Sequence, residues 1–293
     1  MSSIDDSPLR IVEEFDIITG DRVLDAVSGM PAATYFKRDF VFRPGIWRGA
    51  RVRPSWMVAP AQRRIAVVGH ADQHFTVSNA RLLRALGTRQ VYAFNADPLP
   101  GLVAPIPLGL TNHTNESSLH RLFGDTQHLL RAYADAPDRP KFNASIYVNM
   151  TLQNALRERR TALEAVRTLP GAHIEEPTFS DVGRIRYLSS LRGYNFVLSP
   201  PGNGVDTHRT WETLYMGGIP IVQRHPAISP LLEGLPAVQV DDWRELQAEG
   251  FLESEWQRIN AMACDFSKLR VSFWIREIRA VHDRLVGSGA KQN

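Results

Sequence analysis

Residues 199–222, SPPGNGVDTHRTWETLYMGGIPIV, decide the fold. They follow an apolar run at 193–198 and contain a loop of glycine and proline, a helical segment, a Gly-Gly stop and a second apolar run. A strand, a helix and a second strand in this order are typical of a parallel β-α-β unit. Ligands of open α/β sheets bind beyond the carboxyl ends of the strands, so the loop at 199–207, here called the glycine loop, is a candidate binding site.

The same alternation continues upstream. Short apolar runs predict strands at 65–69, 90–94 and 144–148, and helical patterns lie at 77–86 and 153–169. Prolines divide the region before residue 64, where a strand-like alternation occurs at 38–42. The stretch ADAPDRPK at 134–141 is typical of a linker. We therefore predict an α/β protein of two halves, residues 1–138 and 139–293.

Composition excludes several classes of protein. The chain has 293 residues, 43% of them hydrophobic and 22% charged, as in folded globular proteins. The net charge of +3 is not concentrated in a basic block, so no nucleic-acid partner is expected. Cys264 is the single cysteine, which excludes an internal disulfide and fits a reducing compartment. The acidic start predicts no secretory signal, and no apolar run is long enough to span a membrane.

The glycine loop has the residues of an anion site. Gly202 and Gly204, on either side of Asn203, allow a ligand to approach the backbone closely. The helix that follows, with Asp206 or Thr207 as its N-cap, presents free N–H groups that suit a phosphate.

Two cations lie where a helix alone does not favour them. His208 and Arg209 stand in the first helical turn, where the helix dipole opposes positive charge unless an anion is bound. Glu212 shares a helix face with Arg209, so one could grip a diphosphate while the other accepts hydrogen bonds from sugar hydroxyls. The alternative is that the two side chains only pair with each other on a solvated face.

The segment 196–222 resembles the C-terminal motif of exostosin-like glycosyltransferases. Shorter upstream motifs follow in the order of bacterial and viral members: HAD at 70–72, YAFN at 92–95, IPLGLTN at 106–112, and YVN at 147–149 followed by Asn154 and Arg157. The likeness covers residues 64–245.

The resemblance implies a GT-B-like transferase with two Rossmann-like halves and a cleft between them. The C-terminal half would bind a nucleotide-sugar donor and the N-terminal half a saccharide acceptor. Glu212 would then bind ribose or sugar hydroxyls, and Arg209 with the N–H groups after Gly202 and Asn203 would meet the diphosphate. Arg157 is a second phosphate candidate. The second glutamate of many GT-B enzymes is replaced by Pro220, and the chain is short for two full halves.

Inverting sugar transfer needs a general base. The loop after the strand at 65–69 holds His70, Asp72 and His74 at alternate positions, and we expect Asp72, or else His70, to be the base. The alternative is a solvated loop with helix-capping groups. His113 is a weaker candidate.

A metal site is not expected. The sequence has no D-x-D triplet and no zinc-type pair of histidines, and Asp241 and Asp242 are interpreted as helix-capping carboxylates. A metal-independent enzyme would stabilise the leaving diphosphate with arginine and a helix dipole, which the segment at 199–212 offers.

Apolar residues recur at helical spacing from Val271 to Leu285, with arginines among them. We expect this helix to close onto the core; the alternative is contact with a membrane surface that carries a lipid-linked acceptor. The sequence thus predicts a glycosyltransferase of surface-polysaccharide synthesis that is cytoplasmic, either free or peripheral at the inner membrane face. The rival is a non-catalytic glycan- or nucleotide-binding module on the same fold.

Overall fold

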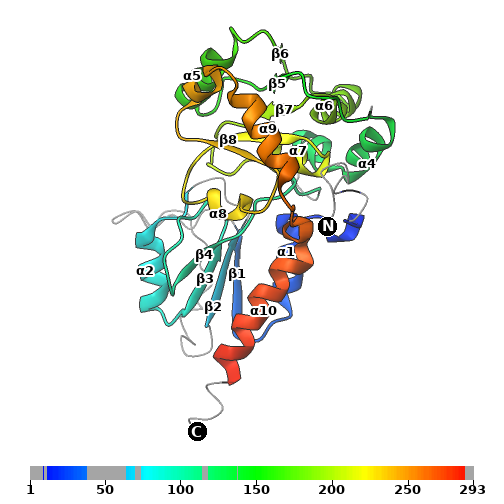
Figure 1. The fold of residues 1–293 in the computed structure, drawn as a ribbon. Coiled ribbons are helices and arrows are strands. Elements are labelled where there is room, and N and C mark those ends of the chain that lie inside the picture. Colours follow the sequence, from blue (N-terminus) through cyan, green and yellow to red (C-terminus); the bar gives the residue numbers. More distant parts are fainter. Residues whose placement is uncertain are drawn as a thin grey trace.

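The computed structural model describes residues 9, 12–37, 64–69, 74–113, 118–136 and 138–287. These residues form two parallel β-sheets flanked by helices, which confirms the predicted α/β class and is compatible with two Rossmann-like halves (Figure 1). The strand-like alternation at 38–42 lies outside the described residues.

The N-terminal sheet has the strand order β1-β2-β3-β4, all parallel. Its strands are β1 (Ala33–Lys37), β2 (Ile65–Gly69), β3 (Gln90–Ala93) and β4 (Val103–Pro105). Helices α1 (Gly20–Ser28) and α2 (Val77–Ala85) accompany it, after the short η2 (Glu14–Asp16). The predicted strands at 65–69 and 90–94 and the helix at 77–86 are therefore confirmed.

The C-terminal sheet has the order β6-β5-β7-β8-β9, again parallel. Its strands are β5 (Ile146–Asn149), β6 (Ala172–Glu175), β7 (Phe196–Leu198), β8 (Ile219–Gln223) and β9 (Val238–Val240). The helical elements are α5 (Leu156–Val166), α6 (Asp181–Gly193), α7 (His208–Tyr215), α8 (Ser229–Leu232), η5 (Trp243–Gln247), α9 (Phe251–Ala261) and η6 (Phe266–Leu269). After β5 the chain adds β6 on one side of that strand, and it then crosses to the other side of β5 to form β7. The direction in which strands are added therefore switches between β5 and β7. A switch of this kind opens a crevice at the carboxyl ends of the two strands.

Helices cross the predicted boundary at residue 138 in both directions. Helices α3 (Ser118–Gly124) and α4 (Thr126–Asp135) come before it but pack on α6 of the C-terminal half, as Figure 1 shows for α4. Helix α10 (Val271–Gly287) comes after it but packs against α1 and runs along the N-terminal sheet. The boundary therefore separates the sheets but not the helices around them.

A single apolar cluster joins the two halves. It contains Ile65 and Tyr92 of the N-terminal sheet together with Trp211 and Tyr215 of α7 and Ile278 of α10. The opposite faces of the two sheets pack in clusters of their own, so both faces of each sheet are covered. Buried strands of this kind are nearly continuous apolar runs, as in parallel sheets generally.

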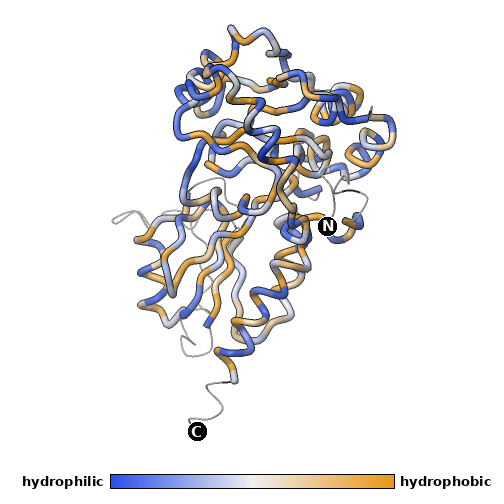
Figure 2. The backbone as a smooth tube through the Cα atoms, viewed as in Figure 1, coloured by the Kyte–Doolittle hydropathy of each residue, from blue (hydrophilic) through white to orange (hydrophobic). Residues whose placement is uncertain are grey.

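The predicted amphipathic C-terminal helix is confirmed as α10. Figure 2 shows hydrophobic and hydrophilic residues alternating along it. Ile275 and Ile278 are buried in the shared cluster, and Val271, Trp274, Val281 and Leu285 pack around it. None of the helices that the structure describes is long and apolar enough to cross a bilayer.

Candidate functional site

A cavity of about 390 Å³ opens at the switch point of the C-terminal sheet. Its walls are the residues that follow β5, β6 and β7, which include most of the glycine loop, together with two side chains of α6 and the first turns of α7. Five further lining residues belong to the N-terminal half: Asn95, Leu108, Thr111, Leu119 and Phe123. The glycine loop, which the sequence indicated as a candidate binding site, thus lines a cavity together with residues of the N-terminal half.

Two arginines give this cavity its charge. Arg159 of α5 is only 9% exposed, and its guanidinium donates to the carbonyl oxygens of Pro201 (3.0 Å) and Thr151 (2.7 Å). Arg209 donates from Nη2 to the carbonyl of Asn149 at 2.8 Å, and its buried Nε has no hydrogen-bond partner in the part of the chain that the structure describes. Among the described residues, no carboxylate pairs with either arginine. The cavity thus holds two positive charges that are fixed by backbone oxygens and not neutralised.

The pKa of Arg159 reflects this arrangement. Burial and then the nearby charge of Arg209 lower its pKa to about 10. A bound anion between the two guanidinium groups would remove their mutual repulsion. The site is therefore chemically suited to phosphate or diphosphate.

The glycine loop packs closely against Arg159 and against the N-terminal half. A Cβ added at Gly202 would lie 3.0 Å from Nη2 of Arg159, and one at Gly204 would lie 2.5 Å from the side chain of Asn95. Asn95 itself has a positive φ of 49°. Thr207, not Asp206, is the N-cap of α7, and its side chain makes no capping hydrogen bond. The start of α7 therefore has no hydrogen bond from its N-cap side chain, and Thr207, His208 and Arg209 line the cavity.

Asp206 ties the glycine loop to the N-terminal half. Its buried carboxylate accepts hydrogen bonds from Leu108 N and from Trp211 Nε1, each at 2.7 Å, and its own N–H donates to Asn95 Oδ1 at 2.8 Å. Burial raises the pKa of Asp206 to about 7, although the donors, which include Thr207 N–H, pull it down. His208 adds a second link, since its Nδ1 lies 2.7 Å from the carbonyl oxygen of Gly109.

Glu212 does not pair with Arg209. Its carboxylate, 4% exposed, contacts Nη2 of Arg184 at 2.5 Å and accepts from Tyr187 Oη at 2.9 Å. Burial alone would raise the pKa of Glu212, but the charge and hydrogen bond of Arg184 hold it below the usual value. The alternative of an Arg209–Glu212 pair is therefore wrong. Glu212 still lines the cavity as a fixed carboxylate.

The second phosphate candidate is displaced by two residues. Arg157 is exposed on α5 and does not line the cavity, whereas Arg159 does. Residues two apart on a helix do not share a face, so only one of them can point at the glycine loop. Sequence reasoning missed Arg159 because α5 carries three arginines and the buried face could not be chosen in advance. Of the other predicted residues, Gly202, Asn203, Gly204 and His208 all line the cavity.

The predicted catalytic residues, Asp72 and His70, lie outside the described residues. His74, from the same loop, is described: its Nε2 lies 3.2 Å from Oδ2 of Asp97, just after β3. His225, from the loop after β8, approaches the same carboxylate at 3.7 Å. His74 and Asp97 of the N-terminal half thus lie beside His225 of the C-terminal half. His113 is exposed.

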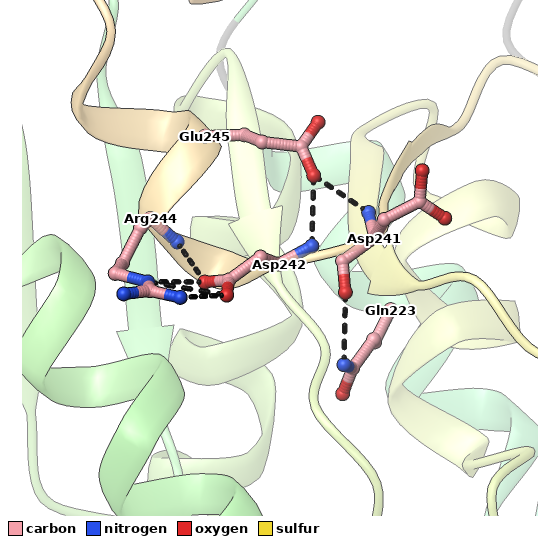
Figure 3. A network of polar contacts seen from close by, with 5 residues as sticks. All are labelled: Gln223, Asp241, Asp242, Arg244 and Glu245. Atoms are coloured by element: carbon pink, nitrogen blue, oxygen red, sulfur yellow. Dashed lines mark hydrogen bonds and ion pairs between the residues drawn. The ribbon is translucent and has the colours of Figure 1, made fainter.

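Asp242 has the capping role that the sequence predicted, whereas the carboxylate of Asp241, one residue before the cap, pairs with Nε of Arg224 at 3.0 Å. Asp242 caps η5 by accepting from Arg244 N at 2.9 Å, and Glu245 returns a carboxylate oxygen to the N–H groups of both aspartates (Figure 3). Across the described ranges, no group of three or more His, Cys, Asp or Glu side chains is arranged to hold a metal ion.

In comparisons with known proteins, no family model matches this chain and no curated protein matches it significantly. The likeness to exostosin-like transferases therefore stays a prediction from the sequence. The function is argued from the geometry of the cavity.

Proposed function

We propose that the protein is a metal-independent, inverting glycosyltransferase of GT-B organisation, which moves a sugar from a nucleotide-sugar donor to a saccharide acceptor. The observation that carries the proposal is the pair Arg159 and Arg209, converging unneutralised on the glycine loop. Two fixed guanidinium groups beside a helix N-terminus match the charge and the oxygen atoms of a diphosphate.

The leaving group of such a transfer is a nucleoside diphosphate, on which negative charge grows as the bond to the sugar breaks. Arginines and helix N–H groups that are already in place stabilise that charge without reorganisation. In this proposal the diphosphate lies at the carboxyl ends of β5 and β7, where the strand order of the C-terminal sheet switches. The sugar would then face the N-terminal half, which supplies five of the cavity's residues.

In this proposal Asp72 is the general base, with His70 as the second candidate. The base takes the proton of an acceptor hydroxyl, the hydroxyl oxygen bonds to the anomeric carbon, and the diphosphate leaves from the opposite face with the bonding electrons. His74 becomes a third candidate because Asp97 holds its ring in one orientation. The acceptor is proposed to be a saccharide, free or lipid-linked, and the setting the cytoplasm or the inner face of its membrane.

The second candidate is a non-catalytic module that binds glycans or nucleotides. The glycine loop and its arginines serve this function equally well, because they bind and do not transfer protons. Turnover separates the two candidates.

The test begins with nucleotide sugars as thermal-shift ligands, since a ligand at 100 times its dissociation constant adds about 2.7 kcal/mol of stability. The donor found in this way is then incubated with saccharide acceptors, and release of the nucleoside diphosphate is measured for wild type and Asp72→Asn. A transferase loses turnover in the variant and keeps donor binding. A donor that binds without turnover under any acceptor supports the module instead.

A further inference from the structure

A second cavity, of about 200 Å³, adjoins the anion site. It shares Asn149, Thr178 and Tyr187 with the larger cavity, so the two are adjacent. Its remaining lining residues are Glu175, Glu176, Gly183 and Arg186. All of them belong to the C-terminal half. The second cavity therefore lies beside the anion site, and among the described residues only the C-terminal half lines it.

We infer that this second cavity binds the base of the donor, and that the base is guanine. The inference rests on the proposed function, because a nucleotide-sugar donor must place its sugar toward the acceptor half. With the diphosphate at Arg159 and Arg209, the nucleoside then extends the other way. The second cavity lies in that direction.

The walls of the second cavity accept hydrogen bonds and carry negative charge. Glu175 is held in place by Tyr147 Oη (2.9 Å), His173 Nε2 (3.0 Å) and Arg186 Nη2 (2.6 Å). Glu176 makes no hydrogen bond or ion pair with any residue that the structure describes, although it lines the cavity. Of the two glutamates, Glu176 is thus the one whose carboxylate is available to accept hydrogen bonds from a ligand.

A carboxylate without a partner distinguishes the bases by the hydrogen-bond donors and acceptors that they present. Guanine presents two adjacent donors, N1–H and N2–H₂, which match the two oxygens of one carboxylate. Uracil presents one N–H between two carbonyl oxygens, and adenine and cytosine each place an acceptor nitrogen beside their amino group. Those acceptors would be repelled by Glu176. Arg186, which donates from Nη2 to Glu175, offers a planar guanidinium on which a base can stack.

The test compares GDP, UDP, ADP and CDP by calorimetry on wild type and on Glu176→Gln. Pyrophosphate measures the anion site alone, and Glu164→Gln, an exposed glutamate on α5 outside both cavities, is the matched control. We expect wild type to bind GDP at least tenfold more tightly than the other three. In Glu176→Gln the affinity for GDP should fall by about tenfold, so that the preference is lost, because a bidentate contact to a base is worth roughly that factor. Pyrophosphate binding should be unchanged.

Two outcomes overturn the inference in different ways. If pyrophosphate binds but UDP, ADP or CDP equals GDP, or if Glu176→Gln keeps the preference, the base assignment is wrong while the anion site stands. If neither pyrophosphate nor any nucleotide binds, the proposed function fails along with it.

Discussion

Asp206 both holds the glycine loop in place and has a strongly shifted pKa. Its carboxylate fixes the glycine loop to Leu108 and Trp211, and burial raises its pKa from 3.8 to about 7. Between about pH 4 and pH 7 the folded chain therefore keeps a proton that the unfolded chain has lost. By linkage, the contribution of this group to the free energy of unfolding falls as the pH rises through that range.

We therefore predict that Asp206→Asn flattens the pH dependence of stability. At about 1.4 kcal/mol for each pKa unit, the wild type should lose on the order of 4 kcal/mol relative to the variant from pH 4 to pH 7. Melting temperatures at several pH values measure the difference, with the exposed Asp138→Asn as control. Parallel curves for wild type and Asp206→Asn would show that Asp206 does not titrate in this range.

Single residues of the site were predictable where the backbone pattern dictated them. Gly202 and Gly204 follow from a loop between a strand and a helix, and both line the cavity as expected. Arg159 and the true partner of Glu212 were not predictable, because they depend on which face of α5 and of α6 turns inward. That choice is made by tertiary packing, which short sequence windows do not contain.

At the scale of elements, the buried central strands were the easiest to predict. β2 and β3 are uninterrupted apolar runs that end in turn residues. β6 was missed because it lies at the sheet edge, with His173 and Ile174 exposed, so its sequence AHIE shows no apolar run. β9, at the opposite edge, is only three residues long.

Helix α10 shows how an element is fixed from a distance. Asp16, at the far end of the sequence, accepts hydrogen bonds from Ser272 N and Ser272 Oγ, each at 2.8 Å. It caps the helix as a local N-cap residue would. No local sequence pattern could have predicted a capping residue that lies 256 positions away in the sequence.

We predict that Asp16→Ala destabilises the protein by about 1–2 kcal/mol, the usual cost of losing a helix cap. Chemical denaturation measures the change, and Asp25→Ala, an exposed aspartate on α1, should be near neutral. Equal effects of the two substitutions would mean that the cap contributes nothing to stability.

At the scale of the whole molecule, the two halves are expected to unfold together. They share an apolar cluster and exchange helices. Tyr215 of α7 adds a buried polar link: its hydroxyl accepts from Ile18 N at 2.9 Å and donates to Leu269 O at 2.6 Å. The linker-like stretch at 134–141 predicted where the two sheets separate. It did not predict that helices pack across this boundary, because such packing leaves no local sequence pattern.

We predict that Tyr215→Phe lowers stability by about 1–3 kcal/mol, since it leaves a buried donor and a buried acceptor unpaired. Circular dichroism and tryptophan fluorescence should report one coincident transition in wild type and the same shift in the variant. Tyr133→Phe is the control, because the Tyr133 hydroxyl makes no hydrogen bond within the described residues. Two separated transitions would show that the halves unfold independently.

The central claim is that Arg159 and Arg209 form a diphosphate site, and pyrophosphate binding tests it most directly. Calorimetry on wild type, Arg159→Ala and Arg209→Ala should show about 10- to 100-fold weaker binding in each variant, as expected for a charged hydrogen bond. Arg157→Ala, two residues from Arg159 but exposed, should bind like wild type. Wild-type protein that does not bind pyrophosphate, or an Arg157→Ala loss as large as that of Arg159→Ala, would contradict the account.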